Sequence, residues 1–127
     1  MHGTGHYATQ LTEQDVRDQG RFEDSIGIFP EFIDGYGVLV LPTTGRYFEI
    51  PYGVLLPQRV ENLLVAGRCI AGDEISHASV RSMMCCAVTG QGAGVAAAVS
   101  IREGSAPRDV SVARVQQELV RQGVRLH

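Results

Sequence analysis

The sequence contains no lysine, and all eleven of its cationic residues are arginine. A chain without lysine has no amine side chain for Schiff-base or nucleophilic catalysis, whereas its guanidinium groups suit the binding of carboxylates and phosphates. The three cysteines, Cys69, Cys85 and Cys86, lack the spacing of a zinc site. We interpret them as buried structural thiols rather than as points of covalent cofactor attachment. Because no apolar leader follows Met1, we expect a reduced, cytoplasmic protein.

A strong charge of either sign is also missing. The formal net charge is −3 and there is no basic run, so nucleic acid and anionic membranes are not expected partners. His2 and His6 have no third ligand close by, so we expect no metal site. A length of 127 residues suits one domain but is short for an enzyme that needs separate cofactor and substrate domains.

Charge is absent from residues 83–101 as well. Such a run is typical of either a membrane span or a buried helix. Gly90, Gly92, Gly94 and the nearby alanines carry little transfer free energy, so we favour a helix buried within the protein. Each glycine weakens a helix by about 0.8–1 kcal/mol relative to alanine. We therefore expect another surface to approach this helix closely.

Residues 62–101 form the stretch around which the chain is organised. The apolar run at residues 63–66 predicts a strand that ends at Gly67, followed by a polar loop and the long helix. We expect Ser79 to cap this helix and the helix to begin near Arg81. Ligands of parallel sheets bind beyond the strand ends, near the N-termini of the following helices. The loop therefore predicts a ligand site, and its chemically able side chains are Arg68, Asp73, Glu74, His77 and Arg81.

Three motifs here resemble the C-terminal signature of FAD-dependent oxidoreductases: V-A-G-R-C-I at residues 65–70, S-x-R-x-M at 79–83 and G-Q-x-A-G at 90–94. Residues 21–53 resemble the substrate-side β segment of those enzymes, so the resemblance covers nearly the whole chain. It implies an α/β protein with a partial FAD/NAD(P)-binding-type fold. The expected elements are a β hairpin region, one parallel-sheet strand, a long buried Gly/Ala-rich helix and a C-terminal helix. The resemblance also implies FAD as cofactor and a small organic substrate that gives up a hydride.

The resemblance places the flavin at the start of the long helix. A helix N-terminus there would stabilise negative charge on N1 and the C2 oxygen of reduced flavin. Arg68 stands where many flavoproteins have an acid, and it is implied to meet a phosphate or a ribityl oxygen. The residues implied in cofactor binding are Gly67, Arg68, Ser79, Val80, Arg81, Ser82 and Met83.

Three residues are candidates for catalysis. Arg81 would add a cation to the flavin edge or to a substrate carboxylate or carbonyl oxygen; the alternative is a surface ion pair with Asp73 or Glu74. His77 suits proton transfer, because histidine titrates near working pH; the alternative is a loop histidine held by packing. Tyr52 would donate to a substrate oxygen, or would hold its loop together as a buried residue.

No G-x-G-x-x-G turn, which holds the FAD pyrophosphate in such enzymes, occurs in the sequence. We therefore expect the C-terminal portion of an oxidoreductase, lacking the N-terminal dinucleotide-binding segment. Such a chain would form a homo-oligomer or pair with a partner chain that carries that segment. The alternative is a non-catalytic orphan domain or a split-enzyme subunit that serves as a binding or assembly module.

The whole chain, residues 1–127, is expected to form a single domain. Thr12 is expected to cap a short helix, and residues 43–45 to form a hairpin turn. Asp109 or Ser111 would cap the last helix, which Gly123 would close. The four expected parts are a loose N-terminal segment (1–20), a substrate-side β segment (21–57), a cofactor-side strand, loop and helix (58–101), and a C-terminal helix (102–127).

Overall fold

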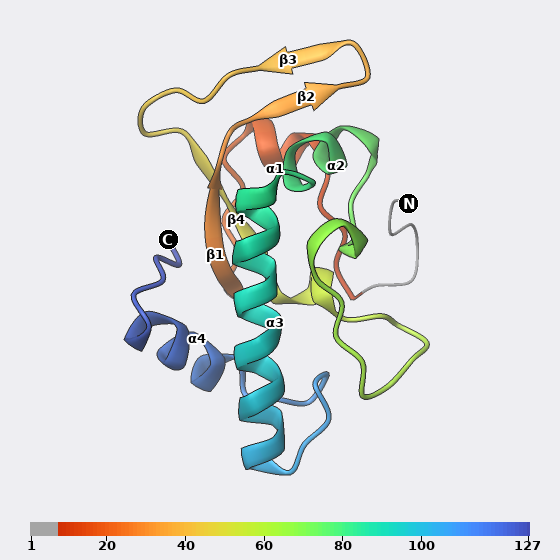
Figure 1. Cartoon of the computed structure of the whole chain (residues 1–127), viewed down its shortest axis with the longest axis vertical. Coiled ribbons are helices and arrows are strands. Elements are labelled where there is room, and N and C mark those ends of the chain that lie inside the picture. The colour runs from red at the N-terminus through yellow and green to blue at the C-terminus, as the bar shows by residue number, and fades with distance from the viewer. Residues whose placement is uncertain (1–7) are drawn as a thin grey trace.

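The computed structural model describes residues 8–127, so His2 and His6 lie outside the described residues. Helix α3 (Met83–Glu103) runs along the length of the molecule (Figure 1). Strands β1 (Ser25–Pro30) and β4 (Tyr47–Pro51) form an antiparallel pair that packs against it through β1. Helix α4 (Val112–Arg121) contacts both α3 and β1.

The remaining elements gather at the N-terminal end of α3. Strands β2 (Ile33–Gly35) and β3 (Val38–Val40) form a hairpin that contacts α2 (Glu74–Val80). Helix α1 (Glu13–Arg17) lies beside α2 (Figure 1). Two short 3₁₀ helices, Tyr52–Leu55 and Gly67–Cys69, pack against α3.

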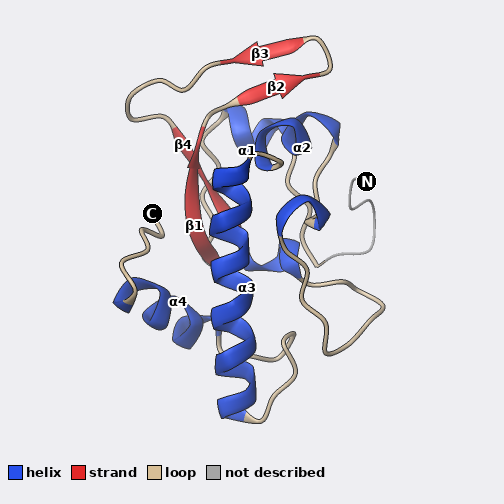
Figure 2. Cartoon of the chain, viewed as in Figure 1, coloured by secondary structure: helices blue, strands red, loops and turns tan. Residues whose placement is uncertain are grey.

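One short helix precedes the four strands and the other helices follow them (Figure 2), so the chain mixes helix and strand and is an α/β protein in the broad sense only. Both sheets are two-stranded and antiparallel. The predicted parallel strand at residues 63–66 is wrong for the described chain, where these residues form no strand. Their one backbone bond to another segment runs from Val65 N–H to Leu55 O, at 3.0 Å. The reason is the lack of a neighbouring strand, since parallel pairing within residues 8–127 is confined to one bridge between Leu11 and Gly72.

The predicted hairpin across residues 43–45 is also wrong. These residues do form a turn, in which Arg46 N–H donates to Thr43 O at 3.2 Å, but the turn connects two different sheets. The hairpin forms earlier, at Tyr36 and Gly37, whose φ angles are 53° and 75°. Two left-handed residues in a two-residue loop give the twist that paired strands need. This local turn therefore decides the pairing of β2 with β3.

The caps of the two outer helices follow the prediction. Thr12 Oγ1 accepts from Asp15 N–H at 3.2 Å, and the Asp15 carboxylate accepts from Thr12 N–H at 2.8 Å. Helix α1 ends early because Gln19 takes a left-handed φ of 55°. Ser111 is the residue that caps α4, and Gly123 follows that helix at a φ of 89°.

Helix α3 is buried along one face, so the predicted burial of this helix holds for that face and not for the opposite one. A Cβ built on Gly92 would lie 2.6 Å from Ile26 Cδ1, so α3 meets β1 closely there. Nothing lies within 4 Å of a Cβ built on Gly90 or Gly94. The close approach expected from three glycines is therefore made by Gly92. The buried residues of α3 are Cys85, Thr89, Gly92, Val95, Ala96, Val99 and Ser100.

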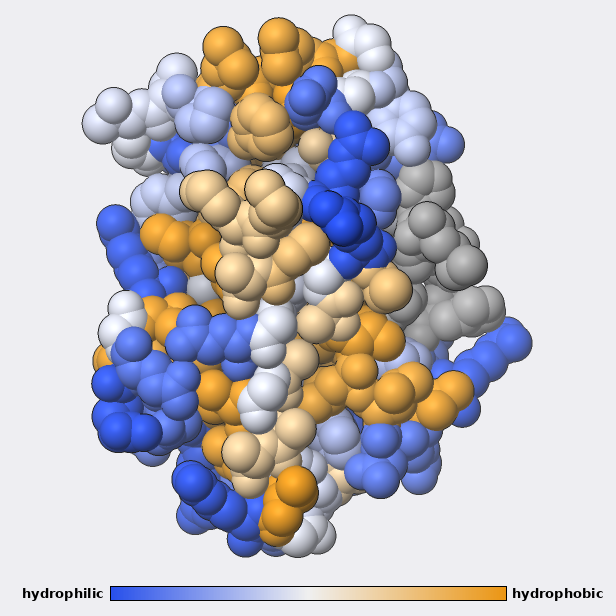
Figure 3. Space-filling model, viewed as in Figure 1, coloured by the Kyte–Doolittle hydropathy of each residue, from blue (hydrophilic) through white to orange (hydrophobic). Residues whose placement is uncertain are grey.

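The outer face of α3 is uncharged and open. Figure 3 shows residues of intermediate hydropathy, tan to white, over the middle of the helix. The exposed residues along this face are Ala87, Gly90, Gln91, Gly94, Ala98 and Ile101. By length and composition alone, α3 could cross a membrane, although 39% of its most apolar window is buried. Its inner face packs as a core helix does.

Buried polar groups tie the C-terminal segment to β1. Ser25 Oγ donates to Leu126 O at 2.6 Å, and Gln116 Nε2 donates to Ser25 O at 3.0 Å. The Glu49 side chain, 1% exposed, accepts from Phe22 N–H at 2.7 Å. Buried polar groups destabilise a fold unless they are paired. This part of the molecule is therefore a satisfied structural core.

Candidate functional site

The predicted loop between Gly67 and Arg81 contains an additional helix, α2. Asp73 Oδ1 caps α2 by accepting from the backbone N–H three residues later, at 2.8 Å. Ser82 Oγ caps α3 in the same way, at 3.4 Å. Ser79 lies buried inside α2, so the prediction that it caps the long helix is wrong. The physical reason is that Asp73 caps α2, which begins before Ser79 and includes it. Ser82 then caps a second helix, α3.

The N-terminus of α3 presents two free backbone donors. Ser82 accepts from Cys85 N–H through Oγ and from Cys86 N–H through its carbonyl oxygen, at 3.0 Å in the second case. The N–H groups of Met83 and Met84 have no acceptor within residues 8–127. Such donors, together with the positive end of the helix dipole, attract anions and electron-rich atoms.

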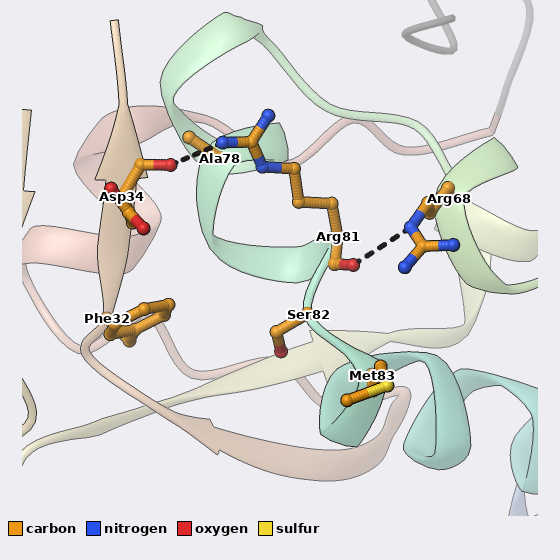
Figure 4. Close-up of a pocket in the computed structure, with 7 residues that line it drawn as sticks. All are labelled: Phe32, Asp34, Arg68, Ala78, Arg81, Ser82 and Met83. Carbon is orange, nitrogen blue, oxygen red and sulfur yellow. Dashed lines mark hydrogen bonds between the residues drawn. The ribbon is translucent and has the colours of Figure 1, made fainter. Parts of the chain in front are cut away.

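A cationic hollow of about 380 Å³ lies beside this helix N-terminus (Figure 4). Arg81 Nη2 donates to the backbone oxygen of Asp34 at 2.5 Å, and Arg68 Nε donates to the backbone oxygen of Arg81 at 3.2 Å. Arg81 makes no ion pair among the described residues, so the alternative of a pair with Asp73 or Glu74 is not what the structure shows. The hollow is lined by Phe32, Asp34, Ala78, Met83 and Ser82 in addition to the two arginines.

The turn that carries Arg68 is fixed against α3. Gly67 N–H donates to Thr89 Oγ1 at 2.9 Å, and Thr89 Oγ1 donates in turn to Cys85 O at 3.2 Å. Gly67 has a φ of 66°, a conformation that favours glycine. These contacts hold the arginine-bearing turn at the start of the long helix.

An apolar hollow of about 310 Å³ adjoins the cationic hollow. The two share Phe32, Ser82 and Met83. The Met83 and Met84 side chains are 80% and 68% exposed, so they form an accessible apolar surface at the helix start. The rest of the lining comes from residues 21–57 and consists of Phe29, Pro30 and Pro42.

Two predicted catalytic residues lie outside both hollows. His77 is buried on α2, 8% exposed, and its backbone oxygen accepts from Arg81 N–H at 3.1 Å. Tyr52 is 2% exposed and its hydroxyl donates to Pro107 O at 2.6 Å. Burial raises the pKa of Tyr52 to about 12. Tyr52 therefore ties two segments together, and Val80, fully buried in α2, likewise sits away from the lining.

The cysteines divide by exposure. Cys85 is buried while Cys69 is exposed, and none of the three forms a disulfide. Burial, and to a lesser degree the neighbouring Cys86, raises the pKa of the Cys85 thiol to about 12. A thiol held protonated is a poor nucleophile. The predicted burial of the thiols thus holds for Cys85 but is wrong for Cys69, which is exposed, and Cys86 is half-buried. Within the described residues no group of three His, Cys, Asp or Glu side chains is placed to bind a metal ion.

Sequence reasoning missed the contribution of β2 to this site. Phe32 and Asp34 line the cationic hollow although Asp34 lies 47 positions from Arg81. A Cβ on Gly35, whose φ is 153°, would lie 2.9 Å from Arg81 Nη2. Nothing in the sequence showed that the hairpin of β2 and β3 would fold against α2 and accept from the Arg81 guanidinium.

A family model described as FAD dependent oxidoreductase matches residues 4–119 of the chain. This range includes every residue that lines the cationic and apolar hollows. No curated protein and no solved structure matches the chain.

Proposed function

Because the chain belongs to the FAD dependent oxidoreductase family, we propose that it supplies the C-terminal, flavin-contacting part of such an enzyme. The observation that carries this proposal is the grouping of electron-poor groups at one end of α3. Two guanidinium groups line the cationic hollow together with Met83, and the free N–H groups of Met83 and Met84 lie in the first turn of α3 beside it. The substrate would be a small organic molecule.

The groups at this end of α3 fit the pyrimidine edge of a flavin. The N–H groups of Met83 and Met84 would stabilise negative charge on N1 and the C2 oxygen. Arg68 and Arg81 would add full positive charges nearby, and the backbone of Gly67 allows a ring to approach. Ser79 and Val80, being buried in α2, would act only by setting the position of Arg81.

Bound FAD supplies a hydride acceptor. The described residues would bind the substrate and take the proton that leaves with the hydride. Asp34 is the carboxylate of the cationic hollow and is our first candidate for the proton acceptor. His77 lies buried on α2 outside both hollows, so we do not assign this proton to it. Phe32 and Met83 would exclude water from the reacting groups.

The same residues do not fit the pyrophosphate and adenosine of FAD, since no glycine-rich turn is present. We propose that a dinucleotide-binding part docks on two open features. One is the uncharged outer face of α3. The other is the segment of residues 63–66, where Leu63 and Leu64 make no backbone hydrogen bond within residues 8–127. Pairing with a strand of that part would give the parallel strand that the sequence predicts.

The proposed arrangement keeps the single domain of residues 1–127 with residues 21–57 on the substrate side. Phe29, Phe32 and Asp34 from that segment line the hollows, which supports this division. A cytoplasmic location is proposed with it, because three cysteines without a disulfide suit a reducing compartment.

The purified chain, titrated with FAD and followed by visible absorbance and by size-exclusion chromatography, tests this proposal. We expect flavin to be retained either by an oligomer of the chain or by its complex with a dinucleotide-binding domain. Arg81→Gln should weaken retention by about tenfold, and Arg59→Gln, which alters an exposed arginine outside both hollows, should not. If both variants retain the same amount of FAD, Arg81 does not contribute to flavin binding.

A binding or assembly module is the second candidate function. The open, uncharged outer face of α3 favours it independently of any flavin chemistry. A chain that ignores FAD in every assembly state, yet forms a stable oligomer through this face, would establish the second candidate over the first. Gly94→Leu on the outer face should then dissociate the oligomer.

A further inference from the structure

We propose that the cationic and apolar hollows together bind one small molecule with a carboxylate at one end and an apolar body at the other. That this molecule is the substrate rests on the proposed function. Its binding depends only on residues within this chain and can be measured without flavin.

The charge of the cationic hollow selects an anionic group. Arg68 and Arg81 contribute two positive charges to its lining, against one negative charge from Asp34. One Nη atom of Arg81 is engaged by the Asp34 backbone, which fixes the plane of the guanidinium. A guanidinium has five N–H donors, so the others remain for a ligand. A planar, oriented guanidinium matches the two oxygens of a carboxylate.

The position of Arg81 is set by β2 as well as by α2. A Cβ on Gly35 would meet Arg81 Nη2 at 2.9 Å and the Ala78 Cβ at 3.2 Å. The guanidinium therefore lies against the hairpin and α2, although Arg81 remains exposed to solvent. Because the Arg81 guanidinium is already positioned before a ligand arrives, less side-chain entropy is lost when the ligand binds.

The apolar hollow selects the rest of the molecule. Its lining consists of aromatic, proline and methionine side chains except for Ser82. Exposed methionines adapt to different apolar shapes, because the side chain is flexible and polarisable. Apolar surface of this kind, left open next to a charge, gains stability when it is covered by an apolar group.

The two hollows meet at Phe32, Ser82 and Met83, so a single short molecule can reach both. The three residues come from the β segment and from the α2–α3 junction, which Figure 4 shows facing one another. A purely polar anion would leave the methionines uncovered, and a purely apolar molecule would leave Arg81 without an ion pair. The juxtaposition of both linings therefore favours an apolar carboxylic acid.

Methyl labelling of methionine provides a direct measurement. The chain has three methionines, of which Met83 and Met84 line the apolar hollow. In the full chain labelled with methyl-¹³C methionine, phenylacetate should shift the Met83 and Met84 methyl signals in a saturable way. Phenylacetamide, which has the same shape without the charge, should bind about tenfold more weakly. Acetate, which has the charge without the ring, should also bind about tenfold more weakly.

Two variants and one control locate the ligand. Arg81→Gln should weaken phenylacetate binding by about tenfold and leave phenylacetamide binding unchanged. Met84→Glu should abolish phenylacetate binding, while its acid in the first turn of α3 leaves the helix stable. Arg59→Gln, outside both hollows, should bind phenylacetate as the original chain does.

Equal affinities for acid and amide, or an unchanged affinity in Arg81→Gln, would overturn the anionic end of the proposal. Equal affinities for acetate and phenylacetate would overturn the apolar end, and no shift with any probe would overturn both. The FAD titration is separate from these measurements. A chain that binds phenylacetate but never FAD would refute the proposed function and retain the acid-binding site. A chain that retains FAD but does not bind phenylacetate would refute the acid-binding site and retain the proposed function.

Discussion

The inner and outer faces of α3 have similar uncharged residues but very different surroundings. On the inner face, Gly92 packs closely against Ile26, and Thr89 Oγ1 accepts a hydrogen bond from Gly67 N–H. On the outer face, Gly90 and Gly94 have no neighbour within 4 Å of a built Cβ. Glycine weakens a helix, and an exposed surface needs no glycine. The two faces therefore differ in how closely the rest of the described chain approaches them.

The largest effect is expected from a substitution that disrupts the contact between Gly92 and Ile26 on the inner face of α3. Gly92→Leu should lower the free energy of unfolding by about 2–3 kcal/mol, because the added side chain overpacks against Ile26. Urea denaturation measures this change. Gly94→Leu is the matched control on the open face and should leave stability unchanged or raise it by up to about 0.8 kcal/mol. Equal losses in both variants would mean that the two faces are not distinct.

Tyr52→Phe removes an inner hydrogen bond and should lower stability near neutral pH by about 1 kcal/mol. The folded-state pKa of Tyr52 is raised to about 12, above the ordinary value of about 10. The stability it contributes is therefore full below about pH 10 and is lost as pH rises through about 12. The phenylalanine variant should thus lose less stability over this alkaline range than the original chain. Denaturant melts at several pH values would show the two curves converging, and parallel curves would contradict the shift.

The first turn of α3 belongs both to the helix and to the lining of the two hollows. Ser82→Ala should lower stability by about 1 kcal/mol, because Cys85 N–H loses its cap. It should also weaken phenylacetate binding, since the first turn that carries Met83 and Met84 would fray. Ser111→Ala removes an equivalent cap from α4 and is the control: similar destabilisation is expected, with phenylacetate affinity unchanged. Loss of affinity in both would indicate a global effect.

The smallest expected effect is a difference in alkylation rate among the three cysteines. Alkylation of the native chain should proceed fastest at Cys69, more slowly at Cys86 and slowest at Cys85, following their exposure. The raised pKa of Cys85 adds to its protection, because the thiolate is the reactive form. Mass spectrometry of iodoacetamide-treated protein would give the order. Early modification of Cys85 would show that the inner face opens readily.

Much of the local structure was predictable because it depends on neighbouring residues. The cap at Thr12, the cap at Ser111 and the long helix all formed as expected. The pairing of strands was not, since Tyr36 and Gly37 offered a tighter turn than residues 43–45. Helix α2 was missed because residues 68–78 were interpreted as a loop, and Asp73 was considered as a ligand-site residue and not as the helix cap that it is.

At the site, Arg68, Arg81, Ser82 and Met83 were predicted and do line one hollow. His77 and Tyr52 were predicted beside them but are buried elsewhere, because α2 turns His77 inward and Pro107 accepts from Tyr52. Asp34 was missed, since only the folding of β2 over α2 brings it to Arg81.

The sequence by itself determined the helix and turn signals, the uncharged character of α3, the absence of lysine and the arginine-bearing motifs. These properties depend on residue type and on spacing along the chain. Only the tertiary structure decided which face of α3 is covered, which strands pair, and that Phe32 and Asp34 meet Arg81. Contacts between distant segments depend on how the whole chain packs, because each buried surface must find a complementary one.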